Sequence, residues 1–395
     1  MHRKANSGRT NVEHPSVRLI AIRPSKGRTH MGVFSLVAET GHEQVLYGHD
    51  PKSGLQTIIA IHSTALGPAL GGTRFYPYES EEQALWDVLR LSRGMTLKAA
   101  AAGLDLGGGK AVIIGDPRHD KNERLWRAYG RMVDSLNGRY ITAEDVGTTS
   151  FDLAMVRRET RWASGVPVEE GGSGDPSPAT AKGLLAALKA IAEFLWGSDN
   201  LHGRRVAIEG VGKVGYHFAG LLAGEGVETI VTDVHQPAVA KAVDDFGVRA
   251  VELEEIMTID CDVLAPCALG ASLNEESIPK LRCEAVAGCA NNQLEKEEDA
   301  LLLAERGILY APDFLVNAGG LINVFEELNG YSEQRAMHHV DAIGQRTFDV
   351  LTAAKERGVN PQDAAMQLAT ERIETISDLR RLSRGGLTWT EVEGT

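Results

Sequence analysis

The chain has 395 residues, too many for one ordinary core, so its length predicts two or three domains. Hydrophobic residues make up 43% and charged residues 24%, which is ordinary for a globular protein. The formal net charge of −13 argues against an extended nucleic-acid interface, because such interfaces carry an excess of Lys and Arg.

No apolar run is long enough for a transmembrane helix, and residues 1–30 lack the apolar segment of a signal peptide. We therefore expect a cytoplasmic protein without a membrane partner. The four cysteines have neither Cys-x-x-Cys nor zinc-like spacing, so we interpret them as reduced thiols and expect no metal site. They are Cys261, Cys267, Cys283 and Cys289.

Residues 1–30 are basic, and we interpret them as a flexible N-terminal extension, with a targeting or nucleotide-binding arm as the alternative. An α/β domain that carries the substrate site is predicted over residues 31–165. Its β-branched runs at 57–62 and 111–114 predict buried strands. A helix is predicted over residues 80–91, with Ser80 as its N-cap.

The Gly- and Pro-rich stretch 165–178 ends this domain. A long helix is predicted over 179–195, and strands at 206–208, 229–232, 262–265, 284–287 and 308–310 alternate with helices. This rhythm predicts a Rossmann-type doubly wound parallel sheet over residues 166–355. We expect the helices in 356–384 to pack back on the first domain and 385–395 to form a polar tail.

A strand, a glycine-rich turn and a helix follow one another at residues 206–223, and the turn matches the dinucleotide-binding pattern G-x-G-x-x-G. Asp233 ends the next strand, 23 residues after Gly210, where a carboxylate accepts from a ribose 2′-hydroxyl and repels a 2′-phosphate. The predicted cofactor is therefore NAD. The predicted contacts in the turn are Gly210, Gly212, Lys213, Val214 and Gly215.

Lys110 follows three glycines and precedes the apolar run 111–114, so we expect it at the mouth of a buried strand. Partial burial there would lower its pKa and make it an acid–base group near neutral pH. The glycine run is no phosphate-binding P-loop, because Leu104 and Ala111 stand where that motif needs Gly and Ser or Thr. Asp145 is the candidate proton-transfer partner, although a turn aspartate is the plainer interpretation.

Several motifs, in order along residues 31–380, resemble those of the glutamate/leucine/phenylalanine/valine dehydrogenase family, most closely its leucine dehydrogenase branch. The motifs are G-P-A-L-G-G-T-R (67–74), R-G-M-T-L-K (93–98), G-L-D-L-G-G-G-K-A-V-I-I-G-D-P (103–117), N-G-R-Y-I-T-A-E-D-V-G-T-T (137–149), G-D-P-S-P-A-T-A (174–181), A-P-C-A-L-G (265–270), N-N-Q-L (291–294) and Y-A-P-D-F-L-V-N-A-G-G (310–320).

The resemblance implies NAD-dependent oxidative deamination of an L-amino acid to the 2-oxo acid and ammonia by a homo-oligomer. It implies that Lys110 and Asp145 are catalytic, and that Lys98 binds the substrate α-carboxylate with help from the backbone of Gly71 and Gly72. Further substrate positions implied by it are Leu70, Met95, Ala143, Asn317, Leu321 and Val324. Further cofactor positions are Thr180 and Asn291.

The implied side-chain pocket is apolar, so a glutamate substrate would bury an unpaired charge. We favour leucine or another branched-chain amino acid. Leu97, Leu321 and Phe325 depart from the leucine dehydrogenase pattern, and F-Y-P-Y (75–78) is similar to the phenylalanine and valine branches. An aromatic amino acid therefore remains an alternative substrate.

Two other classes of protein are considered. A hydroxy-acid dehydrogenase would need a His base and an Arg clamp, where this chain offers Lys110 and Asp145. A non-catalytic NAD-binding regulator is expected to have lost one of Lys98, Lys110 or Asp145, and all three are present.

Overall fold

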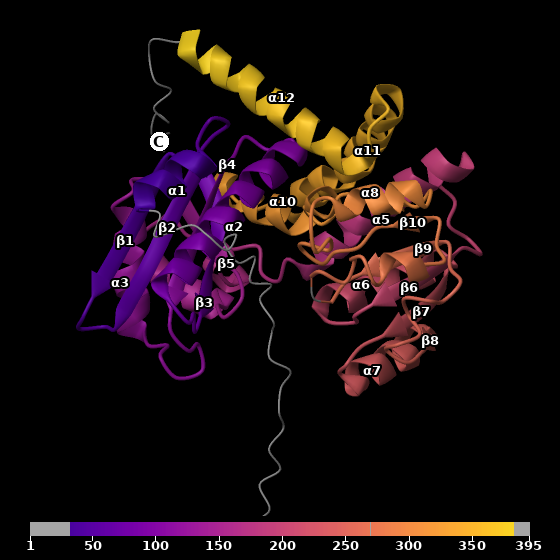
Figure 1. Cartoon of the computed structure of the whole chain (residues 1–395). Coiled ribbons are helices and arrows are strands. Elements are labelled where there is room, and N and C mark those ends of the chain that lie inside the picture. Colours follow the sequence, from indigo (N-terminus) through magenta and orange to yellow (C-terminus); the bar gives the residue numbers. More distant parts are fainter. Residues whose placement is uncertain (1–31, 269, 383–395) are drawn as a thin grey trace, which may run out of the picture. The chain divides into compact units, whose positions relative to one another are not determined.

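The computed structural model describes residues 32–268 and 270–382, and the predicted extension and polar tail lie outside these ranges. The described chain folds into two α/β domains, each built on its own sheet (Figure 1). None of the described helices is both long and apolar enough to cross a membrane.

The elements up to residue 170 are α1 (Val33–Thr40), β1 (Gln44–Asp50), β2 (Leu55–Ser63), β3 (Ala69–Tyr76), α2 (Glu81–Ala101), β4 (Gly107–Ile114), α3 (Glu123–Asp134), β5 (Tyr140–Glu144), α4 (Ser150–Arg157) and η1 (Val168–Glu170). Those that follow up to residue 266 are α5 (Ser177–Trp196), β6 (Arg205–Glu209), α6 (Lys213–Gly224), β7 (Glu228–Thr232), α7 (Gln236–Phe246), β8 (Arg249–Ala250) and β9 (Val263–Pro266). The remaining ones are η2 (Ile278–Lys280), β10 (Ala285–Val286), α8 (Asp299–Glu305), β11 (Leu309–Tyr310), α9 (Asp313–Val316), α10 (Gly319–Phe325), η3 (Glu326–Asn329), α11 (Glu333–Arg357) and α12 (Pro361–Leu382).

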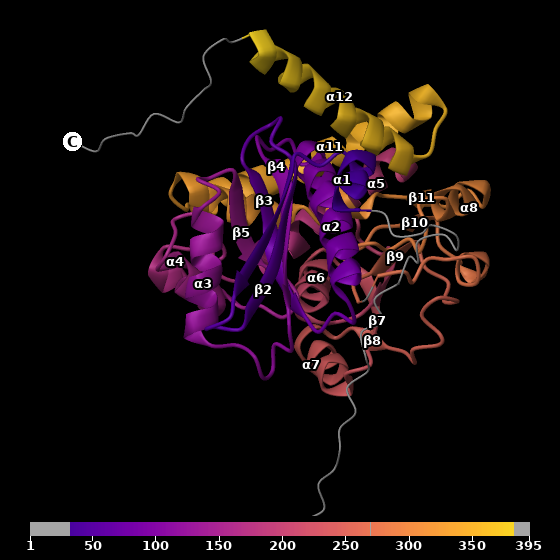
Figure 2. The ribbon, with the colours of Figure 1, turned by 60° about the vertical axis from the view of Figure 1, so that its left-hand side comes forward.

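The first sheet has the strand order β1-β2-β4-β3-β5, with β3 parallel to both of its neighbours and β2 antiparallel to β1 and β4. Apolar side chains from one face of this sheet share a cluster with α3 and α4. Helix α2 lies on the opposite face (Figure 2). Ser80 caps α2 as predicted, since its hydroxyl accepts from the Gln83 N–H, but the helix runs ten residues further than predicted, to Ala101.

Strand β4 begins at Gly107, so the prediction that the strand starts at residue 111 with Lys110 at its mouth was wrong. Three glycines weaken a strand pattern in the sequence, but here they allow close packing. A Cβ on Gly108 would lie 2.1 Å from the backbone nitrogen of Thr96 in α2, and one on Gly107 would lie 2.0 Å from the Ser63 carbonyl oxygen. Lys110 is therefore a residue of the sheet interior, paired with Ala60 of β2.

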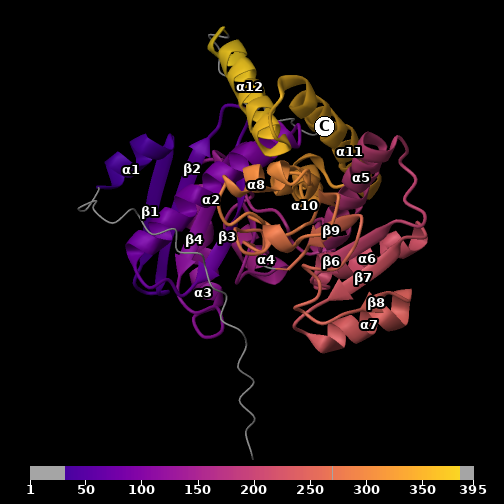
Figure 3. The ribbon, with the colours of Figure 1, turned by 45° about the vertical axis from the view of Figure 1, so that its right-hand side comes forward.

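The second sheet is parallel throughout, with the strand order β11-β10-β9-β6-β7-β8. The chain winds outward from β6 in both directions, as in a doubly wound dinucleotide-binding sheet, so the predicted fold class is confirmed. Side chains alternate between the faces: Val206 and Ile208 belong to the cluster with α5 and α6, and Ala207 to the cluster with α8. Strand β8 and helix α7 lie together at one end of this sheet (Figure 3).

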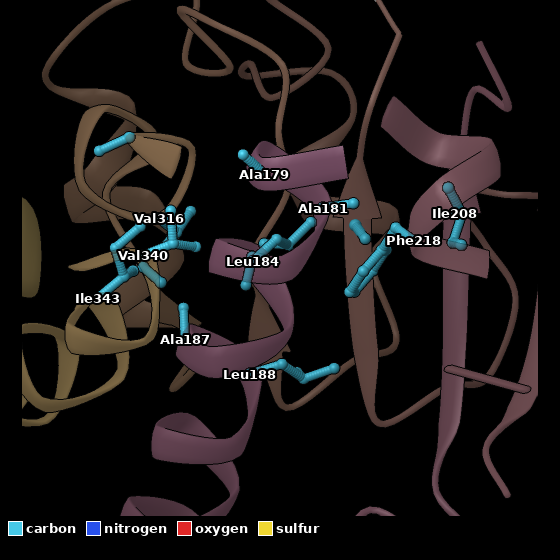
Figure 4. Close-up of a cluster of buried hydrophobic side chains, with 14 of the residues drawn as sticks. Ala179, Ala181, Leu184, Ala187, Leu188, Ile208, Phe218, Val316, Val340 and Ile343 are labelled. Carbon is cyan, nitrogen blue, oxygen red and sulfur yellow. The ribbon is translucent and has the colours of Figure 1, made fainter. Parts of the chain in front are cut away.

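Helix α5 packs between α6 and α11. Its apolar residues Leu184 and Leu188 share one buried cluster with Phe218 of α6 and with Val340 and Ile343 of α11 (Figure 4). This cluster also contains Leu70, Ala143 and Leu321, so it joins the first sheet to the helices that follow the second.

Helix α12 packs against α2, which belongs to the first domain. Ala369 shares a small buried cluster with Ala100, and the Arg372 guanidinium donates to the carbonyl oxygens of Gly103 and Leu104. The last described helix therefore contacts the element that carries Lys98.

Replacing Phe218 with Ala is expected to lower the free energy of unfolding by about 3–5 kcal/mol, because the ring is fully buried and leaves a cavity. The measurement is the urea unfolding midpoint followed by circular dichroism. The matched control is Phe151→Ala in α4, whose ring is 71% exposed and whose loss should change stability by less than about 0.5 kcal/mol. Equal losses in the two variants would contradict this assignment of the core.

Candidate active site

The Lys110 ammonium lies 3.2 Å from a carboxylate oxygen of Asp145, and only 7% of the lysine side chain is exposed. Lys110 stands in β4, and Asp145 directly follows β5. These strands are the two neighbours of β3, so the strand order brings together residues 35 positions apart. A buried ammonium beside a buried carboxylate is an arrangement that can transfer protons.

Gly71 and Gly72 in β3 lie between the strands that carry this pair. A Cβ on Gly71 would lie 1.8 Å from the Gly109 carbonyl oxygen, and one on Gly72 would lie 2.1 Å from the Glu144 carbonyl oxygen. The Gly72 Cβ would also come within 2.9 Å of the Asp145 Cβ. Any side chain at either position would push the strands apart at the ion pair.

Arg74 and Asp87 complete a buried chain of charges that the sequence analysis did not identify. The Arg74 Nε donates to the second carboxylate oxygen of Asp145 at 3.0 Å, and its terminal nitrogen donates to Asp87 at 2.9 Å. Asp87 in turn accepts from the Tyr78 hydroxyl at 2.8 Å and from Arg90 at 3.2 Å. Arg74 ends the G-G-T-R motif, which was the available signal, but its partner 71 residues away depends on the strand order.

The charges of this chain determine which groups are ionised. Burial opposes ionisation of Asp145, but the positive charges of Lys110 and Arg74 outweigh it and lower the pKa of Asp145 to about 2. Burial lowers the pKa of Lys110, and the charge of Arg74 adds to this effect while Asp145 opposes it. Asp145 is thus a fixed anion, and Lys110 is the group of the pair that loses its proton more readily than an exposed lysine does.

Lys98 in α2 is a second, half-buried cation close to this pair. Burial lowers its pKa to about 8, with Asp313 opposing the shift and the charge of Lys110 reinforcing it. No ion pair or hydrogen bond joins its ammonium to another residue within 32–268 or 270–382. A cation in this situation is a ready partner for an anionic group of a ligand.

The predicted pocket residues stand on four elements, and all of them belong to or pack against one large buried cluster that extends over both sheets. Leu70 in β3, Ala143 in β5, and Leu321 and Val324 in α10 are each no more than 8% exposed. Met95 of α2 packs against the same cluster. These predicted pocket residues are therefore apolar and almost fully buried.

Asn317, which caps α9, connects this region to the end of β10. Its amide nitrogen donates to the Cys289 carbonyl oxygen at 3.2 Å and to the Asn291 side-chain oxygen at 2.9 Å. Its own side-chain oxygen is buried and has no partner among the described residues. Thr180, near the start of α5, donates to the Pro176 carbonyl oxygen at 3.0 Å, and its hydroxyl would lie 2.8 Å from a Cβ on Gly320.

The glycine turn between β6 and α6 has the geometry of a phosphate-binding turn. Gly210 has φ +102°, which disfavours any residue with a side chain, and a Cβ on Gly215 would lie 2.0 Å from the Gly210 carbonyl oxygen. Gly212 precedes α6 and is open: a Cβ there would meet no atom within 4 Å. Asp233, at the end of β7, accepts from the Val211 N–H at 2.8 Å, so its carboxylate lies beside the turn.

The first two residues of α6, Lys213 and Val214, lie in different surroundings. Lys213 is 78% exposed, with its ammonium 3.7 Å from Asp175, while Val214 packs against the buried cluster. The open backbone at Gly212 and the helix start behind it fit the pyrophosphate of a dinucleotide. Among the described residues, no group of three or more His, Cys, Asp or Glu side chains could hold a metal ion.

Comparisons with known proteins match nearly the whole chain. The model of the Glu/Leu/Phe/Val dehydrogenase dimerisation domain matches residues 42–162, and that of the Glutamate/Leucine/Phenylalanine/Valine dehydrogenases matches residues 231–381. Leucine dehydrogenase from Geobacillus stearothermophilus is 51% identical over 350 residues, which cover 89% of this chain and 95% of that protein. The chain belongs to the Glu/Leu/Phe/Val dehydrogenase family.

Other members of the family at similar identity act, by their names, on other amino acids. Valine dehydrogenase from Streptomyces virginiae is 50% identical over 343 residues, which cover 86% of this chain and 95% of that protein. The crystal structure of L-tryptophan dehydrogenase from Nostoc punctiforme is 45% identical, with a TM-score of 0.77, and covers 87% of this chain and 99% of that chain. This member of the family is therefore an amino-acid dehydrogenase and thus an oxidoreductase, and its relatives are named for different amino-acid substrates.

Replacing Arg74 with Met is expected to move the acid limb of the kcat/KM profile to higher pH. Without the guanidinium, burial dominates and the pKa of Asp145 rises from about 2 toward its ordinary range or above. Because protonation neutralises Asp145, activity would then be lost at a pH where the unaltered enzyme keeps it.

Arg90→Met is the matched control for this measurement, because Arg90 contacts Asp87 but not Asp145. In Arg74→Lys the positive charge is kept, so the acid limb should move less than in Arg74→Met. An acid limb that stays in place in Arg74→Met would refute a role for Arg74 in holding Asp145 ionised.

Proposed function

We propose that the protein catalyses the reversible, NAD-dependent oxidative deamination of an apolar L-amino acid to its 2-oxo acid and ammonia, with leucine and other branched-chain amino acids favoured. The observation that carries the proposal is the buried Lys110–Asp145 pair, with the unpaired cation of Lys98 close by. The dimerisation-domain match supports a homo-oligomer as the working form.

Lys98 would bind the α-carboxylate of the substrate. Its ammonium is half-buried and has no partner within the described ranges, so an incoming carboxylate would meet a cation that is only partly hydrated. A bound carboxylate would also raise the pKa of Lys98 above about 8 and keep it charged. The backbone of Gly71 and Gly72, where side chains are excluded, would approach the same carboxylate closely.

Lys110 would act as the acid–base group. In its neutral form it accepts a proton from the substrate ammonium, which leaves the free amine. NAD, held by the residues of the glycine turn, would supply the acceptor for the hydride that leaves the substrate Cα. Lys110 releases this first proton to solvent, and in its neutral form it then takes a proton from the water that adds to the iminium carbon. Asp145 stabilises the lysine ammonium that forms, and this cation stabilises charge on the developing carbinolamine oxygen. Lys110 passes its proton to the carbinolamine nitrogen and takes the hydroxyl proton as ammonia leaves, and the 2-oxo acid remains.

The glycine turn and its neighbours would hold the cofactor. Gly212 and the first residues of α6, Lys213 and Val214, would face the pyrophosphate, and Asp233 would accept from the adenosine ribose. A carboxylate at this position disfavours the 2′-phosphate of NADP, which supports NAD. Thr180, Asn291 and Asn317 would lie toward the nicotinamide end, where the unpartnered oxygen of Asn317 can accept from a ligand N–H.

The apolar cluster supports an apolar substrate side chain. Leu70, Ala143, Leu321 and Val324 offer no partner for a charge, so a glutamate side chain would be buried unpaired at a cost of several kcal/mol. Leucine and valine differ by one methylene, which discriminates by only about 1–3 kcal/mol. The similarity to L-tryptophan dehydrogenase keeps aromatic amino acids as the second candidate class.

Lys110→Ala and Asp145→Asn are each expected to lower kcat by about 10²- to 10⁴-fold, because the first removes the group that transfers protons and the second removes the charge that stabilises its ammonium. The measurement is the absorbance of NADH formed with saturating leucine. Lys121→Met is the matched control: it removes a lysine that pairs with Asp152 at 2.5 Å in the same domain but away from this site. Activity that survives in both site variants would rule out the proposed mechanism.

The preferred substrate is tested by the ratio of kcat/KM values for leucine, valine, phenylalanine and tryptophan. We expect the kcat/KM value for leucine to exceed those for phenylalanine and tryptophan by about tenfold or more. It should exceed the value for valine by no more than about 10- to 200-fold. Enlarging the space by Leu321→Ala should shift the ratio toward the aromatic amino acids. A preference for tryptophan in the unaltered enzyme would reject the branched-chain assignment and leave the deamination chemistry intact.

A further inference from the structure

The four cysteines face one another in pairs at the two ends of strands β9 and β10. The parallel ladder pairs Val263 with Ala285 and Leu264 with Val286. The same register continues before the strands, where Asp260 and Arg282 form a bridge, and places Cys261 opposite Cys283. After the strands the pairing shifts by one residue: the Ala290 N–H donates to the Pro266 carbonyl oxygen at 2.9 Å, so Cys267 and Cys289 are the chain neighbours of the two residues that this hydrogen bond joins.

Cys267 and Cys289 also point to the same face of the sheet. Both are half-buried and pack against the cluster that contains Ala265 and Ala287, two residues earlier on each strand. The Cys267 thiol, together with burial, raises the pKa of the Cys289 thiol, which indicates that the two thiols are neighbours. Neighbouring strands are about 4.8 Å apart, and a disulfide joins Cα atoms about 4.4–6.8 Å apart, so the bond can form without a large backbone movement.

This pair lies between the cofactor turn and the substrate lysine. A Cβ on Gly215 would lie 3.4 Å from the Cys267 Cβ, which places Cys267 against the glycine turn. The Cys289 carbonyl oxygen accepts from Asn317, and the charge of Lys98 acts on the Cys289 thiol. Cys261 and Cys283, in contrast, belong to the cluster on the other face, at the opposite end of the strands.

We propose that Cys267 and Cys289 are a modification site, a dithiol that a peroxide oxidises to a disulfide and that thereby switches the dehydrogenase off. One thiolate attacks the peroxide to give a sulfenic acid and water, and the second thiol displaces a further water to form the S–S bond. The two thiols lose two electrons and two protons, and hydrogen peroxide is reduced to two molecules of water. A dithiol reductant reverses the reaction.

The disulfide acts through the backbone on both sides of it. Drawing the two sulfurs together moves the segments that follow β9 and β10, and with them the contact at Gly215 and the hydrogen bond from Asn317. Displacements of about 1 Å in such positions reduce turnover by about a hundredfold. Cys267 and Cys289 themselves have no assigned role in the reaction, so the reduced enzyme does not depend on their sulfur atoms.

The rate of oxidation should depend on pH. The neighbouring Cys267 thiol and burial raise the pKa of the Cys289 thiol well above its ordinary value. Because the thiolate is the reactive form, oxidation is slow at neutral pH and accelerates as the pH rises. The switch therefore responds to sustained oxidant rather than to brief exposure.

The experiment treats the full-length enzyme with hydrogen peroxide and follows activity, free thiols after denaturation, and cross-linked peptides by mass spectrometry. We expect the free thiols to fall from four to two, one cross-link between the peptides of residues 267 and 289, and a loss of activity of about tenfold or more. Dithiothreitol should restore both the thiols and the activity.

Cys289→Ser and Cys267→Ser should each keep their activity under the same treatment, whereas the matched control Cys283→Ser should be inactivated like the unaltered enzyme. The peptide mapping is done on the unaltered enzyme, so its result tests the proposal even if one substitution impairs folding. The proposal is overturned if no 267–289 cross-link forms, if the cross-link forms without loss of activity, or if resistance follows Cys283→Ser instead.

Discussion

Burying two cations and two carboxylates inside one domain is the constraint that organises this site. Lys110, Asp145, Arg74 and Asp87 form a continuous chain in which each charge has an opposite neighbour within 3.2 Å. Removing one member of a buried pair costs about 3–5 kcal/mol, because the charge left behind has lost both water and partner. The chain therefore tolerates little change, and the same burial that makes it costly to disturb also lowers the pKa of Lys110 below that of an exposed lysine.

Glycine makes this burial possible. The sheet can hold a lysine at its centre only because the strand beside it carries no side chains at Gly71 and Gly72, and because Gly107 to Gly109 let α2 and the neighbouring strands come within contact of β4. In the second sheet, glycines serve a different purpose: they form the turn after β6, where the strand order reverses and a dinucleotide can reach the start of α6. Glycine thus allows close packing in one domain and leaves the backbone open to a ligand in the other.

The relatives explain why chemistry and specificity separate in this family. Leucine and valine dehydrogenases are similar to this chain to nearly the same degree, and a tryptophan dehydrogenase shares the fold at 45% identity. In the proposed function the charged chain serves the α-carbon and its substituents, which all amino acids share, and the glycine turn serves the cofactor. The substrate side chain would meet only a few apolar residues, among them Leu321 and Val324 on α10, where differences of a methylene are worth about 1–3 kcal/mol.

The sequence by itself determined the alternation of strands and helices, the cofactor turn and the candidate lysines and aspartate. Hydrophobic periodicity, turn-forming residues and short motifs each involve residues that are close together in the sequence. The sequence did not place Lys110 within β4, since three glycines resemble a loop until α2 is packed against them. Only the tertiary structure paired Arg74 with Asp145 and Asp87, and placed cysteines 22 positions apart at the same ends of two paired strands. Those pairings follow from strand order and register, which join residues that no local pattern connects.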